Sequence, residues 1–125
     1  MVGVDISKTM IKFTKKRFTK RLIKNTELYV VDGEHLPFLT DEFDIAYTCG
    51  MFIHVSTEYI KNYIQEVMRV CRIGCFGESQ CQNNKKEYYF CHDYATILDE
   101  LGFSFKILSG ELQIPSKSCY FSVTK

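Results

Sequence analysis

The chain has 125 residues, of which 46% are hydrophobic and 25% are charged. This length and composition are typical of one ordinary soluble domain with a single core. No window approaches the roughly 20 apolar residues of a membrane span, and the N-terminus lacks the basic-then-apolar pattern of a signal peptide. We therefore expect one cytoplasmic domain over residues 1–125, without a membrane segment.

The net charge is only +1, but the charged residues are unevenly distributed. Residues 26–125 carry eight basic and fourteen acidic residues, a net of −6, so the other eight basic residues lie near the N-terminus with no acid among them. Such a block indicates either a nucleic-acid-binding surface or a solvated helix face, because lysine is also a good helix former. The eight are Lys8, Lys12, Lys15, Lys16, Arg17, Lys20, Arg21 and Lys24.

Six cysteines are many for this length and raise the question of disulfides or zinc. They contain no C-x-x-C pair, which a structural zinc site usually shows. Several fall in apolar runs (TCGMF, RVCRIGCF, SCYFSV), where cysteine behaves as a small buried hydrophobe. We expect reduced core thiols and no metal, with zinc and disulfides as the alternatives. The six are Cys49, Cys71, Cys75, Cys81, Cys91 and Cys119.

Strand and helix signals alternate along the first third of the chain. The apolar run Val2–Asp5 predicts a strand, and Ser7 is suited to cap a helix that continues to about Lys24. The β-branched run LYVVD, Leu28–Asp32, predicts a second strand. The buried stripe of the helix would contain Met10, Ile11, Phe18 and Leu22.

The middle of the chain continues this alternation. A loop over residues 33–42 leads to a third strand, Phe43–Thr48, and Ser56 can cap the next helix. A fourth strand, Ile73–Glu78, follows a turn at Gly74. The apolar positions of the helix are Tyr59, Ile60, Tyr63, Ile64, Val67, Met68 and Cys71.

After the polar stretch SQCQNNKKE, a helix over Asp93–Leu101 is expected to end at Gly102, which suits a left-handed cap. Two last strands, Phe103–Leu108 and Cys119–Thr124, would be joined by a loop containing Pro115. This order of elements predicts an α/β fold with a mostly parallel sheet, covered by helices, and an antiparallel C-terminal strand pair.

Three strand ends carry polar or small residues, at the edge where open α/β sheets bind ligands. An acid ending one strand can accept two ribose hydroxyls, and an acid ending the next can accept the amino hydrogens of a purine. The alternative is that these acids are simple loop-entry residues. The candidates are Asp5, Asp32 with Gly33, and Thr48 with Cys49 and Gly50.

Four segments in order, GVDISKTM, LYVVDGEHLPFLTDEFDIAYTCGMFIHV, YIQEVMRVCRIG and ILDELGF, resemble the class I S-adenosylmethionine-dependent methyltransferases. The similarity is to the small-molecule branch often called type 11. Its most specific part is DGEHLPFLTDEFDIAY, with an acid, a small residue, a Leu-Pro-Phe turn and a Phe-Asp strand start at the family's spacing. The resemblance implies a Rossmann-like three-layer sandwich and S-adenosylmethionine as cofactor.

On the adenosine side, the resemblance implies that Asp5 holds the ribose and Ile6 packs on the adenine. Asp32 would meet the adenine amino group, and Gly33 would offer its backbone N–H to a ring nitrogen. Glu34 would help to shape this loop.

On the methionine side, the resemblance implies that Thr48, Cys49 and Gly50 lie under the sulfonium. Leu36, like Glu34, would shape the adenine loop. His54 matches a position where the family often has histidine, and it is more often structural than catalytic there. No catalytic residue is assigned, because methyl transfer depends mostly on placement of the two reactants.

The sequence departs from the family at two places. The turn that ordinarily reads Lys-Pro-Gly-Gly is Arg72–Cys75 here. The family's first strand and glycine-rich loop, expected roughly 20 residues before Asp5, do not occur in the sequence. We therefore expect an N-terminally truncated domain whose missing segment, or a partner chain, is needed for tight cofactor binding. Alternatively, Val2–Asp5 pairs directly with Phe43–Thr48.

The methyl acceptor implied by the resemblance is a small molecule or tRNA. Tyr88, Tyr89, Phe90 and His92 either line an acceptor pocket or are core and loop aromatics. Two other functions are considered. One is a non-catalytic remnant that binds a partner or nucleic acid through the basic block Lys8 to Lys24. The other, a different doubly wound nucleotide binder, is disfavoured by the DGEHLPF loop.

Overall fold

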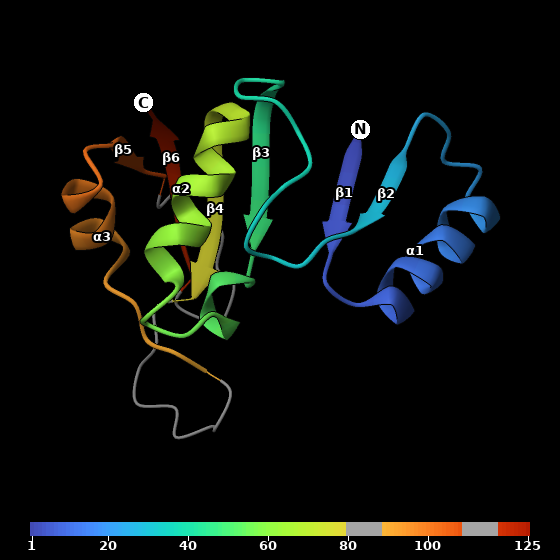
Figure 1. Ribbon diagram of the computed structural model, residues 1–125, viewed down its shortest axis with the longest axis horizontal. Helices are drawn as coiled ribbons and strands as arrows, with labels where there is room; N and C mark the ends of the chain where they lie inside the picture. Colours follow the sequence, from blue (N-terminus) through green and yellow to red (C-terminus); the bar gives the residue numbers. More distant parts are fainter. Residues whose placement is uncertain (80–88, 109–117) are drawn as a thin grey trace. The chain divides into compact units, whose positions relative to one another are not determined.

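The computed structural model describes residues 1–79, 89–108 and 118–125 (Figure 1). The polar stretch at 80–87, with Cys81, and the expected residues Tyr88 and Pro115 lie outside these ranges. The chain divides into two compact units, Met1–Pro37 and Phe38–Lys125. None of the helices in the described ranges is long and apolar enough to cross a membrane.

The first unit is a strand–helix–strand motif. Strand β1 (Val2–Asp5) pairs in parallel with β2 (Glu27–Val30), and helix α1 (Lys8–Lys20) connects them. Ser7 caps α1 as predicted, because its Oγ accepts the Met10 N–H at 3.2 Å. The two strands thereby end at the same edge of the sheet.

Helix α1 is shorter than the prediction, which extended it to Lys24. It stops at Lys20 because Leu22 and Asn25 have φ angles of +55° and +58°, a left-handed conformation that a right-handed helix cannot contain. Leu22 is consequently 80% exposed and not part of the buried stripe. Met10 is exposed as well, so Ile11 and Phe18 alone of the predicted stripe pack against the strands.

The second unit contains a four-stranded sheet in the order β3-β4-β6-β5. Strand β3 (Phe43–Cys49) lies parallel to β4 (Cys71–Ser79), whereas β6 (Ser118–Thr124) is antiparallel to both β4 and β5 (Ser104–Ile107). The predicted antiparallel C-terminal pair is therefore confirmed. Strand β1 pairs with β2. The alternative pairing of Val2–Asp5 with Phe43–Thr48 would join the two units and stays a prediction.

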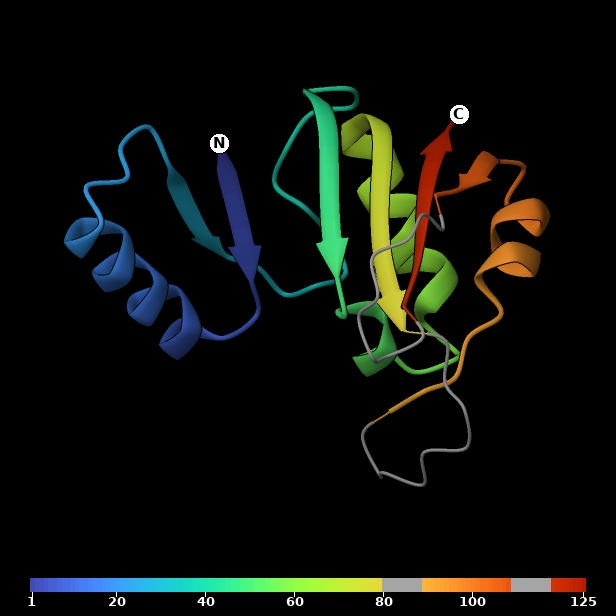
Figure 2. The same cartoon turned by 180° about the vertical axis from the view of Figure 1, so that it is seen from behind.

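Among the described residues of this unit, three helical segments accompany the sheet: η1 (Phe52–His54), α2 (Ile60–Val70) and α3 (Tyr94–Glu100). Helix α2 lies across one face of β4, as the front and back views both show (Figures 1 and 2). Gly102, at φ +76°, ends α3 in the predicted left-handed conformation. Ser56 does not cap α2 with its side chain; its carbonyl accepts the N–H of Tyr59 and Ile60 instead.

Strand β4 follows α2 directly, so the predicted turn at Gly74 is wrong. The register pairs Gly74 with Ala46 of β3, in the interior of the sheet. A Cβ at Gly74 would lie 2.7 Å from Met68 Sδ, which is closer than real Cβ contacts, so glycine lets α2 approach the strand here. The departure from the Lys-Pro-Gly-Gly turn thus falls within a strand.

The core of the second unit lies between the sheet and its helices. Aromatic rings meet edge to face within it, with the Phe52 and Phe76 centroids 5.2 Å apart. On the opposite sheet face, Ile45 and Tyr47 are 60% and 66% exposed. The fully buried apolar side chains are Phe52, Ile60, Ile64, Met68, Cys71, Leu98, Phe121 and Val123, each below 2% exposed.

The five described cysteines are free thiols. Cys71 and Cys119 are buried, as expected for core thiols, and burial raises the pKa of both. Cys49 and Cys91 are exposed, so the prediction of a core position is wrong for these two. Cys49 is the last residue of β3, and Cys91 lies in the segment before α3.

Candidate functional site

Asp5 is fixed at the point where β1 passes into α1. Its Oδ1 accepts the backbone N–H of Ser7 at 2.8 Å, and its carbonyl accepts the N–H of Val31 beyond β2 at 3.1 Å. The side chain is half-buried, while the next residue, Ile6, is 68% exposed. A carboxylate has about four lone-pair positions, so Asp5 retains acceptor capacity for hydroxyl donors.

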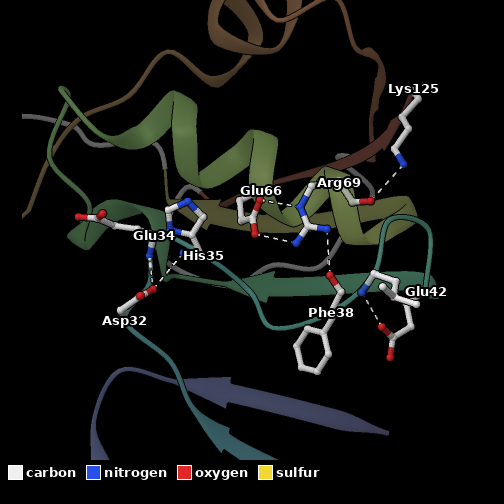
Figure 3. A network of polar contacts seen from close by, with 9 residues as sticks. Asp32, Glu34, His35, Phe38, Glu42, Glu66, Arg69 and Lys125 are labelled. Carbon is white, nitrogen blue, oxygen red and sulfur yellow. Dashed lines mark hydrogen bonds and ion pairs between the residues drawn. The ribbon is translucent and has the colours of Figure 1, made fainter.

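Asp32 organises the loop that follows β2. Its Oδ1 accepts the backbone N–H groups of Glu34 and His35, each at 2.9 Å, which is an Asx turn (Figure 3). The hydrogen bonds from His35 and Glu34 lower the pKa of Asp32, so this exposed carboxylate is held in its charged form. Gly33, at φ +91°, supplies the left-handed residue inside the turn.

The described residues of the first unit also line a hollow of about 230 Å³ beside α1. Its walls are largely apolar, and Asp5 alone of the predicted binding residues contributes to it. The lining includes Val2, Val4, Ile11, Phe18 and Leu28.

In the second unit, β3 ends in a loop with open space beside it. The hydroxyl of Thr48 donates to Glu78 Oε1 at 3.0 Å, and the N–H of Gly50 donates to the carbonyl of Gly77 at 2.8 Å. Gly50 has a φ of +59°, and a Cβ built there would meet no atom within 4 Å. The backbone at Gly50 is therefore accessible to a molecule that approaches closely.

Cys49 does not share the environment of Thr48. Side chains alternate along a strand, so Tyr47 and Cys49 lie on the exposed sheet face while Thr48 is half-buried toward the core. The hydrogen bond with the Cys49 side chain is the largest cause that raises the pKa of Tyr47 to about 12. Of the three predicted residues, Thr48 and Cys49 thus present their side chains to opposite faces.

Glu78 is the residue of this site that sequence reasoning missed. It is 0% exposed, and its two oxygens accept the N–H groups of Met51 at 3.3 Å and Phe52 at 3.1 Å, besides the Thr48 hydroxyl. Burial raises the pKa of Glu78, and these hydrogen bonds oppose the rise. The sequence did contain a signal for it, because Glu78 is an acid near the carboxyl end of β4, and β4 pairs with β3, the strand that carries Thr48.

His92 holds the far side of the same loop. It is 8% exposed, and its Nε2 lies 3.1 Å from the carbonyl oxygen of Phe52 and 2.8 Å from that of Val55. The backbone N–H of Phe90 donates to the carbonyl of Ile53 at 2.8 Å. The segment from Thr48 to Val55 is therefore clamped, with Glu78 accepting its N–H groups and His92 bound to its carbonyls.

His92 accordingly supports the loop from inside, and it does not face an open acceptor pocket. The exposed His54 ring instead lies beside Tyr89, with centroids 5.2 Å apart. Both of these rings are exposed and Phe90 is half-buried, and an acceptor surface at this cluster stays a prediction.

Arg69 connects α2 to the chain that enters β3. It makes a bidentate ion pair with Glu66, with both N···O distances at 2.8 Å, and its Nη1 donates to the carbonyl of Phe38 at 2.9 Å (Figure 3). Its own carbonyl accepts the N–H of Asp41 at 2.9 Å, and Lys125 bonds Asp41. These contacts fix the position at which β3 begins. They thereby also set the position of Thr48 near the other end of this strand.

The fold of the chain is that of S-adenosylmethionine-dependent methyltransferases. A SAM-dependent methyltransferase from Aquifex aeolicus superposes with a TM-score of 0.76 at 14% identity, over 98% of this chain and 66% of its own. The magnesium protoporphyrin IX methyltransferase of Synechocystis PCC 6803, solved with bound SAH, gives 0.74 at 17% identity, over 99% of this chain and 64% of its own.

The sequence model of the family described as "Methyltransferase domain" matches residues 1–74. The chain belongs to this family, which confirms the resemblance and the predicted Rossmann-like fold. No match was found among curated proteins.

The [4+2]-cyclase SpnF has the same fold, with a TM-score of 0.76 at 13% identity over 99% of this chain and 65% of its own. In addition, the chain spans about two thirds of the length of these three structures, from 64% to 66%.

Proposed function

We propose that this chain is an S-adenosylmethionine-dependent methyltransferase domain, in which the acids after β1 and β2 bind the cofactor. The observation that carries the proposal is the pair of strand-end carboxylates, Asp5 held by Ser7 and Asp32 held in its Asx turn, in a chain of this family. When bound, S-adenosylmethionine supplies an electrophilic methyl group on a sulfonium.

The residues of the first unit fit the chemistry of adenosine. Asp5 has acceptor positions left for a ribose diol, and the exposed Ile6 offers an apolar surface to a flat ring. The charged Asp32 suits an adenine amino group, and the half-buried Gly33 presents backbone without a side chain. Glu34 is exposed at the rim of this turn.

In the second unit we assign the methionine part of the cofactor to Thr48, Cys49 and Gly50. The open space beside Gly50 supports this assignment, because ligand atoms can approach the backbone there. For Cys49 the contact would come from the backbone, since its side chain lies on the exposed sheet face with Tyr47. Glu78 contributes by holding the loop, and it is too deeply buried to touch a ligand.

The reaction is in-line transfer of the methyl group to an N, O, S or C nucleophile of a small molecule or a tRNA. Positioning of two reactants can supply roughly 7–11 kcal/mol of the barrier, so the domain needs no nucleophile of its own. We place the protein in the cytoplasm.

Binding is best tested by NMR, which detects weak as well as tight ligands. Titration of the ¹⁵N-labelled chain with S-adenosylhomocysteine should shift the amide signals of Asp5, Ile6, Gly33 and Glu34, and those of residues 48–50. S-inosylhomocysteine, which carries an oxygen in place of the adenine amino group, should bind more weakly because Asp32 then faces an acceptor. Shifts confined to other residues, or none up to millimolar ligand, would overturn the proposal.

A variant pair separates binding from folding. Asp5→Ala should weaken S-adenosylhomocysteine by about 1–3 kcal/mol, the cost of leaving ligand donors unpaired, which is roughly 5- to 150-fold in affinity. Asp44→Ala is the matched control, because Asp44 is an exposed carboxylate on β3 that pairs only with Arg72 in the described structure. If the two variants bind S-adenosylhomocysteine with equal affinity, Asp5 does not belong to the binding site.

A further inference from the structure

Helix α1 carries a basic surface that the cofactor site does not use. All eight basic residues between Lys8 and Lys24 are exposed. Lys12, Lys16 and Lys20 are spaced four residues apart and therefore line one side of the helix. We call this row of three the basic face.

The basic face points away from the strands. Successive residues turn by about 100° around a helix, which places Lys16 well away from Ile11 and Phe18. Ile11 is buried and Phe18 half-buried where α1 packs on β1 and β2. The side of α1 that carries Ile11 and Phe18 is therefore already occupied. A helix that lies in a membrane surface needs that side free, so a lipid bilayer is the less suitable partner.

The charges of this region lack carboxylate partners, whereas four of the five other described basic residues have one. Lys61, Arg69, Arg72 and Lys125 each form an ion pair with a carboxylate. Within the described ranges, none of the eight basic side chains of the first unit forms one. Eight cations without carboxylate partners, six of them on α1, concentrate a positive potential in this region, which attracts polyanions.

An aromatic side chain accompanies these charges. The guanidinium carbon of Arg17 lies 6.0 Å from the ring centroid of Phe13, which is 55% exposed and, at three residues before Lys16, lies on the same side of the helix as that lysine. An exposed ring beside cations is a combination that nucleic-acid surfaces use, because a base can stack where a phosphate is neutralised.

We propose that the basic face of α1 binds the phosphate backbone of a nucleic acid. The 13-residue helix is about 20 Å long, and duplex nucleic acid carries about one charge per 1.7 Å of axis, so several phosphates lie within its reach. Of the acceptor classes named above, this favours RNA. The surface itself is independent of the cofactor, and its test involves no S-adenosylmethionine.

The test is fluorescence anisotropy of a labelled 20-base-pair RNA duplex and of the DNA duplex with the same sequence, between 50 and 200 mM KCl. Each phosphate contact contributes about −0.9 to the slope of log K against log salt. Lys12→Gln/Lys16→Gln/Lys20→Gln should therefore flatten the slope by about 2.7, so the wild type loses about 40-fold more affinity than the variant across this range. Circular dichroism checks that the variant keeps its helix.

A matched variant controls for net charge. Lys61→Gln/Arg72→Gln/Lys106→Gln also removes three positive charges, from exposed positions outside α1, and should leave the slope unchanged. The proposal is supported if either duplex binds, the α1 variant flattens the salt slope and the control variant does not. A preference for the RNA duplex identifies RNA as the ligand. Equal losses in the two variants, no binding at 50 mM salt, or binding only to vesicles of anionic phospholipid would overturn it.

Discussion

Replacement of Glu78 tests whether one buried carboxylate holds the loop after β3. In Glu78→Ala, the backbone N–H groups of Met51 and Phe52 lose their acceptor, and the Thr48 hydroxyl, which is free to rotate about its C–O bond, loses its acceptor as well. Each stranded donor costs about 1–3 kcal/mol, and removal of a desolvated carboxyl returns part of this. We expect a net loss of about 2–4 kcal/mol, a large share of the roughly 5–15 kcal/mol that stabilises a typical domain.

The assay is urea unfolding at pH 7, followed by circular dichroism, with the free energy of unfolding taken by linear extrapolation. Glu58→Ala removes the same charge from an exposed position and should change stability by no more than about 0.5 kcal/mol. Amide exchange localises the effect, because Phe52 should lose protection before residues of α3 do. A Glu78→Ala protein as stable as Glu58→Ala would refute the reasoning.

Two further predictions concern local features. Ser7→Ala should lower the free energy of unfolding by about 1 kcal/mol, because α1 loses its cap. Ser56→Ala should be neutral or slightly stabilising in the same urea assay, because the buried Oγ of Ser56 has no hydrogen-bond partner in the described structure. Equal losses in the two variants would contradict the cap assignment. Mass-mapped modification of the native protein with a thiol reagent should label Cys49 and Cys91 first and Cys71 and Cys119 only after unfolding; early labelling of the last two would contradict their burial.

Local signals predicted the elements whose boundaries depend on one or two residues. Ser7 begins α1 because its hydroxyl accepts a helical N–H, and Gly102 ends α3 because glycine tolerates a positive φ. The Asp32–Gly33 turn is of the same kind. Its carboxylate bonds two N–H groups within three residues, so the sequence alone contains all of its partners.

The errors arose where partners lie far apart in the sequence. The start of β4 at Cys71 is fixed by its register with Phe43 of β3, and no local pattern distinguishes it from the last turn of a helix. Glu78 lies 26 residues, and His92 lies 40 residues, from Phe52 of the loop that they hold. Their roles depend on the pairing of β3 with β4 and on the packing of the segment before α3.

The last prediction concerns pH, and it uses Glu78→Gln to isolate one group. Burial raises the folded-state pKa of Glu78 above its ordinary value of 4.5, so in the window above 4.5 the folded protein binds more protons than the unfolded chain. Stability contributed by this group is therefore lost as the pH rises through that window.

Asp32 and Asp93 have lowered pKa values because they accept backbone hydrogen bonds, so their contributions are lost as the pH falls below about their ordinary value of 3.8. The pKa values of Cys71 and Cys119 are raised above their ordinary value of 9.0, so these two thiols change the stability only above about that pH. Between pH 4.5 and 7.5, the difference in unfolding free energy between Glu78→Gln and wild type should thus move in favour of the variant as pH rises, while Glu58→Gln shows no such trend. A flat or opposite difference would mean that the hydrogen bonds to Glu78 outweigh its desolvation.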